Sequence, residues 1–169
     1  MKVIDVEKLR RMVHYNPDNG EFTWLPRGNN QWTSRWAGKK AGNLSPSGYV
    51  TISVDGIVYK AHRLAWAYMT GENPEHEIDH ADLDKTNNAW SNLRSATPSQ
   101  NKANKRPLST NTSGFKGVFR GKPRAKPWRA AIMVDGKRLE LGHFLTKEDA
   151  ASAYNQKARE LRGEFARVS

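Results

Sequence analysis

The chain has no cysteine, and none of its apolar runs is long enough to span a bilayer. Disulfide bonds and cysteine-ligated zinc sites are therefore excluded. The first residues lack the apolar core of a signal peptide. We therefore expect a cytoplasmic protein that makes no membrane contact. A length of 169 residues leaves room for one modest domain or for two small ones.

Positive charge is what the sequence has in excess, with a formal net charge of +11. The charge is unevenly placed along the chain. Residues 102–169 contain 16 Lys and Arg against 6 Asp and Glu, whereas residues 1–101 contain 12 against 11. This distribution predicts a polyanionic partner, nucleic acid before membrane, that is held mainly by the C-terminal part of the chain.

The most informative stretch is residues 77–101. A short strand is predicted to end at Asp79 and His80, and a turn rich in Asp and Asn follows it. A second short strand is predicted after the turn. Thr97, which is followed by proline and then, three positions on, by glutamine, has the pattern of a helix N-cap. Asn101 is thereby placed in the first turn of a helix.

These residue types support the hydrolysis of a phosphodiester. Asp79 and Asn101 supply oxygen ligands, which a hard divalent ion such as Mg²⁺ prefers. An adjacent histidine, here His80, can act as general base on a water molecule. A bound metal ion stabilises the charge that develops on the phosphate oxygens and the leaving group. An isolated Asp-His pair would be typical of a solvated turn, but the ordered set that includes Asn92 favours catalysis.

The same stretch resembles the HNH, or ββα-metal, nucleases, in the branch that includes phage and intron homing endonucleases. The residues that carry the resemblance are His62-Arg63-Leu64-Ala65-Trp66, Ile78-Asp79-His80, Asn87-Asn88, Asn92-Leu93-Arg94 and Gln100-Asn101. The resemblance assigns Asp79 and Asn101 to one Mg²⁺ or Mn²⁺ ion per site. It assigns His80 to the base and Asn92 to bracing the loop between the strands. Asn104, one helical turn beyond Asn101, is an alternative second ligand.

The region before this stretch has weaker signals. The patterns predict a helix at residues 5–14, a strand at 21–24, an irregular segment at 25–43, a hairpin at 48–59 and a helix at 61–69. Basic residues alternate with tryptophans in the irregular segment. It is therefore either a nucleic-acid grip or a loop that its tryptophans anchor to the core. His62 is expected to be a structural hydrogen-bonding residue rather than a catalytic one.

A second module is predicted after a linker at residues 106–113. It has three strands and a helix over residues 147–162, capped by Thr146 and ended by Gly163. The helix is expected to pack on one sheet face through Ala150, Ala151, Tyr154, Ala158 and Leu161. The other face, which carries basic residues, can enter a major groove. We predict DNA contacts from Lys102, Lys105, Arg106, Lys116, Arg120, Arg129 and Arg138.

This module resembles the ethylene-response-factor DNA-binding domain of plants. The matching residues are Gly114-Phe115-Lys116-Gly117-Val118, Trp128-Arg129-Ala130-Ala131-Ile132, Leu141-Gly142-His143-Phe144, the run from Thr146 to Asn155, and Gly163-Glu164-Phe165-Ala166. Glu140 departs from the aromatic or Arg groups that the family often has before Leu141. No plant target sequence is therefore carried over to this chain.

Together these patterns predict an α+β protein with an HNH nuclease domain at residues 1–105 and, after the linker, a DNA-binding domain at residues 114–169. The second domain is expected to be a three-stranded antiparallel sheet packed on one helix. The expected function is that of a metal-dependent homing-type endonuclease, which hydrolyses double-stranded DNA to 5′-phosphate and 3′-hydroxyl ends.

With one active site per chain, we expect the protein to nick DNA as a monomer in a phage-infected bacterial cell, without a small-molecule cofactor. The alternative is a non-catalytic, sequence-specific DNA-binding protein or regulator derived from such a nuclease. The intact set of Asp79, His80 and Asn101 favours the enzyme.

Overall fold

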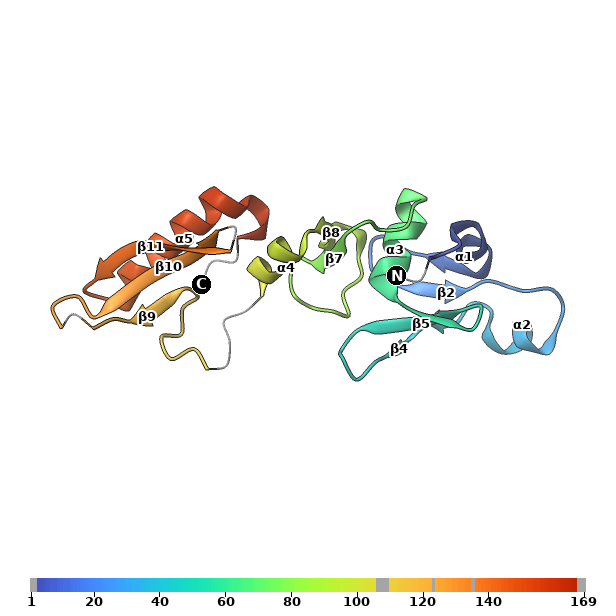
Figure 1. The fold of residues 1–169 in the computed structure, drawn as a ribbon. Helices are drawn as coiled ribbons and strands as arrows, with labels where there is room; N and C mark the ends of the chain where they lie inside the picture. The colour runs from blue at the N-terminus through green and yellow to red at the C-terminus, as the bar shows by residue number, and fades with distance from the viewer. Residues whose placement is uncertain (1–2, 106–109, 123, 135, 167–169) are drawn as a thin grey trace. The chain divides into compact units, whose positions relative to one another are not determined.

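The computed structural model describes residues 3–105, 110–122, 124–134 and 136–166, in which helices and strands are mixed (Figure 1). The chain divides into two compact units, residues 1–98 and 99–169. The domain boundaries expected from the sequence stay predictions, and residues 106–109 of the expected linker lie outside the described ranges. Among the helices of these ranges, none combines the length and the apolar character that a membrane span requires.

The N-terminal unit contains three small antiparallel sheets, with strand orders β1-β2-β3, β4-β5-β6 and β7-β8. A single core contains Leu9, Phe22, Ile52 and Leu64, which are fully buried. The elements are α1 (Val6–Met12), β1 (Val13–Tyr15), β2 (Phe22–Trp24), α2 (Gln31–Trp36), β3 (Lys40–Ala41), β4 (Asn43–Leu44), β5 (Val50–Val54), β6 (Ile57–Lys60), α3 (Ala61–Thr70), β7 (Glu77–His80), a 3₁₀ turn (Trp90–Asn92) and β8 (Leu93–Ala96).

Two local predictions for this unit are confirmed and two are wrong. Strands β5 and β6 form the expected hairpin, and α3 ends at Gly71, which adopts a left-handed conformation with φ 81°. The first helix, however, stops at Met12, because the next three residues pair with β2. Residues 25–43 are also not wholly irregular, because they contain α2 and β3.

The C-terminal unit is built on an antiparallel sheet with strand order β11-β10-β9. Helix α5 packs on one face of this sheet, with Ala150, Tyr154 and Ala158 buried against it. Leu161, which was expected in the same stripe, is 42% exposed because it lies beyond the last buried residue of the helix. The elements are α4 (Pro98–Asn104), β9 (Val118–Arg120), β10 (Trp128–Val134), β11 (Lys137–Phe144), α5 (Lys147–Arg162) and a 3₁₀ turn (Gly163–Phe165).

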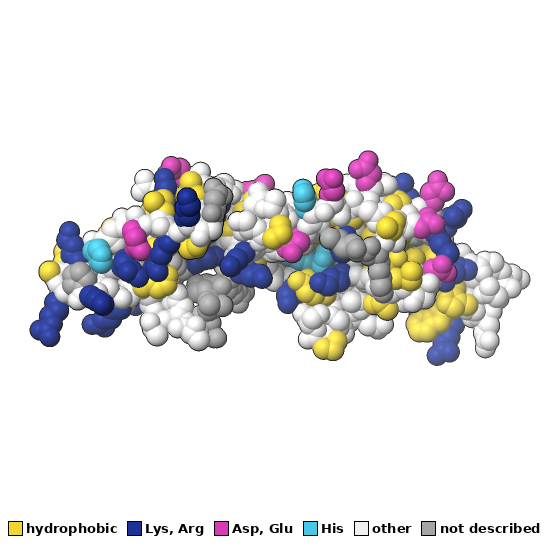
Figure 2. All heavy atoms as spheres, in the orientation of Figure 1, with side chains coloured by type: hydrophobic (Ala, Val, Ile, Leu, Met, Phe, Trp, Pro, Cys, Tyr) yellow, Lys and Arg dark blue, Asp and Glu magenta, His cyan; other side chains and the backbone are white. Residues whose placement is uncertain are grey.

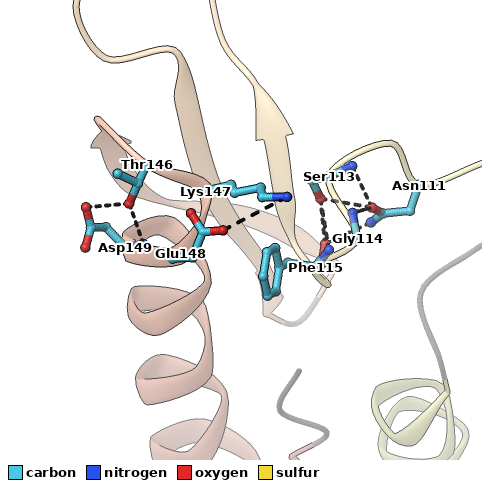
Figure 3. Close-up of polar contacts among 8 residues, drawn as sticks. All are labelled: Asn111, Ser113, Gly114, Phe115, Thr146, Lys147, Glu148 and Asp149. Carbon is cyan, nitrogen blue, oxygen red and sulfur yellow. Dashed lines mark hydrogen bonds and ion pairs between the residues drawn. The ribbon is translucent and has the colours of Figure 1, made fainter.

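Side-chain caps hold the segments that enter β9 and α5 (Figure 3). The Oγ1 atom of Thr146 accepts a hydrogen bond from the backbone N–H of Asp149 at 3.1 Å, as predicted for the N-cap of α5. Before β9, the Oδ1 atom of Asn111 accepts hydrogen bonds from the backbone N–H groups of Ser113 and Gly114, at 3.0 and 2.8 Å. Such turns satisfy backbone donors that would otherwise be left without partners.

Candidate active site

Asp79 lies near the end of β7, where the register sets it directly opposite Arg94 on β8. Its side chain is 5% exposed. The Oδ2 atom accepts hydrogen bonds from Nε and Nη2 of Arg94, at 3.1 and 2.9 Å. A cross-strand ion pair therefore fixes the direction of this carboxylate. The sequence analysis had given Arg94 no role, because only the strand register shows that the two side chains meet.

His80, the next residue, is buried and has its own orienting partner. Its Nε2 atom lies 3.2 Å from Oδ1 of Asn88, whose Nδ2 donates to the carbonyl of Thr86. This second bond turns the amide oxygen of Asn88 toward the histidine. Nε2 of His80 is therefore the donor, and Nδ1 carries the lone pair that can take a proton.

Burial favours the neutral imidazole of His80. It lowers the pKa of His80, although the hydrogen bond that His80 donates to Asn88 and the carboxylate of Asp82 act in the opposite direction. The neutral form is the one that can accept a proton from water. The side chain that the sequence singled out as the base is thus in the required protonation state near neutral pH.

The loop between β7 and β8 is closed by Asn92. Its Nδ2 donates to Oδ1 of Asp82 at 2.9 Å and to the carbonyl of Asn87 at 2.8 Å. Its Oδ1 accepts from the backbone N–H of Asp82 at 3.0 Å. One buried amide therefore ties both sides of the loop together, which restricts the position of the loop that carries Asn88.

The turn after β1 supports Asn88 from the other side. The hydroxyl of Tyr15 donates to the carbonyl of Asn88 at 2.7 Å. Gly20, at φ 73°, is so close that an added Cβ would lie 2.1 Å from the carbonyl carbon of Asn88. Only glycine fits there, in both conformation and space. The sequence showed a strong turn at this place, but nothing local indicated that the turn packs against the active-site loop.

His62, at the start of α3, lies against the proposed base. The ring centroids of His62 and His80 are 4.9 Å apart and the rings are perpendicular, while the ring of Tyr49 lies 5.2 Å from that of His62. The Nδ1 atom of His62 is buried and has no hydrogen-bond partner within the described residues. The structure therefore shows ring packing against His80 at this position, where the sequence analysis expected a hydrogen bond.

The burial of His62 predicts a loss of stability in acid. Burial, aided by the nearby charges of Lys60 and Arg63, lowers the pKa of His62 from 6.5 to about 3. Between these values the unfolded chain binds one more proton than the folded chain, so the free energy of unfolding falls as the pH falls. The loss should be about 2 kcal/mol between pH 6.5 and pH 5. Thermal melts across this range should show a smaller loss for His62→Gln than for the parent.

The exposed His14 supplies a matched control for that experiment. His14→Gln should follow the parent at every pH, because this exposed side chain makes none of the buried ring contacts of His62. If the melting curves of His62→Gln and the parent shifted in parallel, His62 would not be the group that couples folding to pH.

The two candidates for the second metal ligand lie on α4, in the other compact unit. Asn104 is 4% exposed, whereas Asn101 is partly exposed. Burial does not choose between them, because Asp79, the other proposed ligand, is itself 5% exposed. Asn101 stays the predicted partner of Asp79.

The predicted DNA-contacting residues on the C-terminal sheet lie on two different faces of it. Arg129 and Arg138 share the sheet face that α5 leaves uncovered, and their guanidinium carbons lie 5.9 and 4.8 Å from the ring centroid of Phe119. Glu140 lies between them, at 3.6 Å from Nε of Arg129 and 2.9 Å from Nε of Arg138. Arg120 pairs with Trp128, which packs toward α5, so Arg120 is on the opposite face from Arg129.

The remaining predicted contacts lie around α4. The ammonium group of Lys116 donates to the carbonyls of Ala103 and Lys105, which close the C-terminal end of this helix. Lys102 and Lys105 are exposed, and Arg106 lies outside the described residues. Figure 2 shows Lys and Arg side chains spread over the visible face of the part that carries β9 to β11. Lys116 thus has a structural role that its charge alone did not indicate.

Comparison with known proteins identifies the family. Residues 59–103 match a family model described as HNH endonuclease. An uncharacterized HNH endonuclease of Acanthamoeba polyphaga mimivirus is 35% identical over 153 residues, which are 86% of this chain and 78% of that protein. This chain belongs to the HNH endonuclease family. Protein 3.8 of Escherichia phage T7 is 37% identical over 113 residues, 64% of this chain and 92% of that protein.

One solved structure, from a study of DNA binding and cleavage by the HNH homing endonuclease I-HmuI, is also similar. The sequence identity is 24% and the TM-score is 0.44. The match covers 62% of this chain, which spans 57% of that one.

As an HNH endonuclease the protein is a nuclease, and nucleases of this family generally depend on a divalent metal ion. The donor types fit such an ion, because Asp79 and an asparagine amide offer oxygen atoms alone. No group of three or more His, Cys, Asp or Glu that could hold a metal occurs in the described ranges.

Proposed function

We propose that this HNH endonuclease hydrolyses phosphodiester bonds in double-stranded DNA, with its catalytic centre at Asp79 and His80. The observation that carries the proposal is the pair of buried, oriented side chains at the end of β7. The carboxylate is held by Arg94, and the neutral imidazole is held by Asn88. The partners of the two side chains offset the cost of burying them and hold both in fixed directions, as a catalytic centre requires.

In this proposal His80 accepts the proton of the attacking water at Nδ1, while Asn88 holds the opposite ring nitrogen. Asp79 and Asn101 would hold one Mg²⁺ or Mn²⁺ ion. When bound, that ion supplies positive charge against the phosphate oxygens and the departing 3′ oxygen. Hydrolysis leaves a 5′-phosphate and a 3′-hydroxyl. A single centre per chain makes a monomer a nicking enzyme of the homing type.

We propose that the C-terminal unit, through its likeness to the ethylene-response-factor domain, holds the DNA duplex. The support is the exposed sheet face with Arg129 and Arg138, together with the excess of positive charge after residue 101. Each phosphate that a Lys or Arg neutralises releases counterions, so binding by this unit should depend steeply on salt.

Opposite effects on binding are expected from Arg138→Ala and Glu140→Gln. Arg138→Ala removes a cation, which should weaken duplex binding and lower the slope of log K against log salt by about 0.9 for one lost phosphate contact. Glu140→Gln removes the carboxylate that competes for both arginines and should tighten binding. Fluorescence anisotropy with a labelled duplex across a salt series, in EDTA, measures both.

Arg159, exposed on α5, is the matched control, because Arg159→Ala removes the same charge from the other side of the sheet. Its salt slope should stay at the parental value. Equal slopes for Arg138→Ala and Arg159→Ala would mean that the open sheet face does not touch the phosphates.

The proposed activity is tested by incubating the full chain with supercoiled plasmid and Mg²⁺ or Mn²⁺. Open circles should appear before linear DNA, EDTA should prevent them, and the new ends should be ligatable without added phosphate. A chain that binds the plasmid yet never relaxes it would instead be the non-catalytic DNA-binding protein that the sequence left as the alternative.

A further inference from the structure

The N-terminal unit contains a hollow whose lining does not include the residues around His80. Its volume is about 600 Å³, and it is lined by Trp24, Trp32 and Trp36 together with the cationic side chains of Arg27 and Lys40. The nuclease mechanism uses none of these residues. The pocket is formed by α2 and other residues of the segment 25–43 that was expected to be irregular, together with Trp24 and part of the hairpin of β5 and β6.

Helix α2 is built in a way that leaves its tryptophans outside the core. None of its six residues is buried, and Trp36 is 40% exposed. Of the three tryptophans that line the pocket, Trp24 packs on the core of the unit, and the partly buried Trp32 contacts Trp24 edge to face with ring centroids 5.6 Å apart. Trp36 therefore does not anchor this segment to the core, whereas Trp32 is joined to the core through its contact with Trp24. The exposed ring of Trp36 thus shares one hollow with two partly buried tryptophan rings, an arrangement that indicates a binding surface.

A cation accompanies each of these rings. The guanidinium carbon of Arg27 lies 3.9 Å from the ring centroid of Trp32, and that of Arg35 lies 5.3 Å from the ring of Trp36. Two buried nitrogens of Arg27, Nε and Nη2, have no hydrogen-bond partner among the described residues. Figure 2 shows hydrophobic and basic side chains next to one another at the end of the unit that carries α2. Rings for stacking and cations for phosphate are thus combined at one site.

We propose that this pocket binds an unpaired nucleotide of a DNA strand, with its base stacked on the exposed ring of Trp36 and its phosphate near Arg27 in the lining and Arg35 beside that ring. The choice of an unpaired nucleotide follows from geometry. In a duplex the faces of a base are covered by its neighbours, so only a single-stranded or extruded base can stack on a protein ring. The inference rests on the proposed function, because it takes DNA as the substrate of the nuclease.

Binding of dye-labelled oligo-dT of about twelve nucleotides tests the inference, with a blunt duplex of the same length measured beside it. Both are measured by anisotropy in EDTA, so that neither is cut. Trp36→Ala should weaken oligo-dT binding roughly tenfold or more and should change duplex binding by less than about twofold. Arg35→Ala should weaken oligo-dT binding in the same direction. Leu44→Ala, which removes another exposed apolar side chain of this unit, should change neither.

Several results would overturn the inference. The first is an affinity for oligo-dT that is unchanged in both Trp36→Ala and Arg35→Ala. The second is an equal loss of affinity for the duplex in these variants. The third is tighter, tryptophan-dependent binding of oligo-U, which would make the site one for RNA. Circular-dichroism melts of each variant show that the fold is retained. Plasmid nicking by the same samples separates the two claims. If the parent nicks plasmid but Trp36→Ala binds oligo-dT normally, only the pocket fails. If the parent neither nicks nor binds DNA, the proposed function fails.

Discussion

Asp79→Asn should lower the rate of DNA cleavage by at least roughly 10²-fold while the protein stays folded. The change removes the charged member of the proposed metal-binding pair but keeps the shape of the side chain. Asparagine also keeps an oxygen that can accept from Arg94, which is only 15% exposed. Alanine would leave that guanidinium without its partner, at a cost on the order of 3 kcal/mol. The structure thus makes asparagine the cleaner substitution.

The measurement is the rate of plasmid nicking as a function of Mg²⁺ concentration, with Asp18→Asn as the control. Asp18 lies exposed in the turn after β1, and its variant should match the parent. Asn101→Ala should show the same loss as Asp79→Asn. Parental rates for Asp79→Asn at all metal concentrations would remove this carboxylate from the metal site.

His80→Ala should reduce cleavage by roughly 10²–10⁴-fold, the usual contribution of a general base. DNA binding should change little, because this side chain is 5% exposed and does not belong to the basic sheet face. Single-turnover nicking with protein in excess isolates the chemical step from binding.

A control variant and a chemical rescue show whether the loss is specific to the imidazole of His80. His76→Ala removes an exposed imidazole four residues earlier and should leave the rate unchanged. Added imidazole should restore part of the activity of His80→Ala, because it supplies the missing base in the cavity that the substitution leaves. A His80→Ala variant that cut DNA at the parental rate would show that another group removes the proton.

The elements that the sequence predicted well are those with signals confined to a few neighbouring residues. The hairpin turn at Asp55-Gly56, the end of α3 at Gly71 and the cap of α5 at Thr146 depend on local backbone chemistry alone. The adjacent positions of Asp79 and His80 at a strand end belong to this group as well. Their exposure does not, since both side chains are buried where a solvated turn was the alternative.

What the sequence could not show are contacts between distant segments. Arg94 meets Asp79 only through the register of two strands. Gly20 and Tyr15 support Asn88, and His62 packs on His80, across separations that no local pattern encodes. Helix α2 was missed because it has no buried face, and therefore no hydrophobic periodicity by which to find it.

The central claim is that Asp79 and His80, at the end of β7, catalyse DNA cleavage, while other surfaces of the protein bind the DNA. Single-turnover nicking of supercoiled plasmid, with binding measured on the same samples, tests this claim most directly. The parent should nick only with Mg²⁺ or Mn²⁺ present, and Asp79→Asn and His80→Ala should bind DNA within about twofold of the parent yet leave the plasmid supercoiled. Parental nicking by either variant, or nicking by the parent in EDTA, would contradict the account.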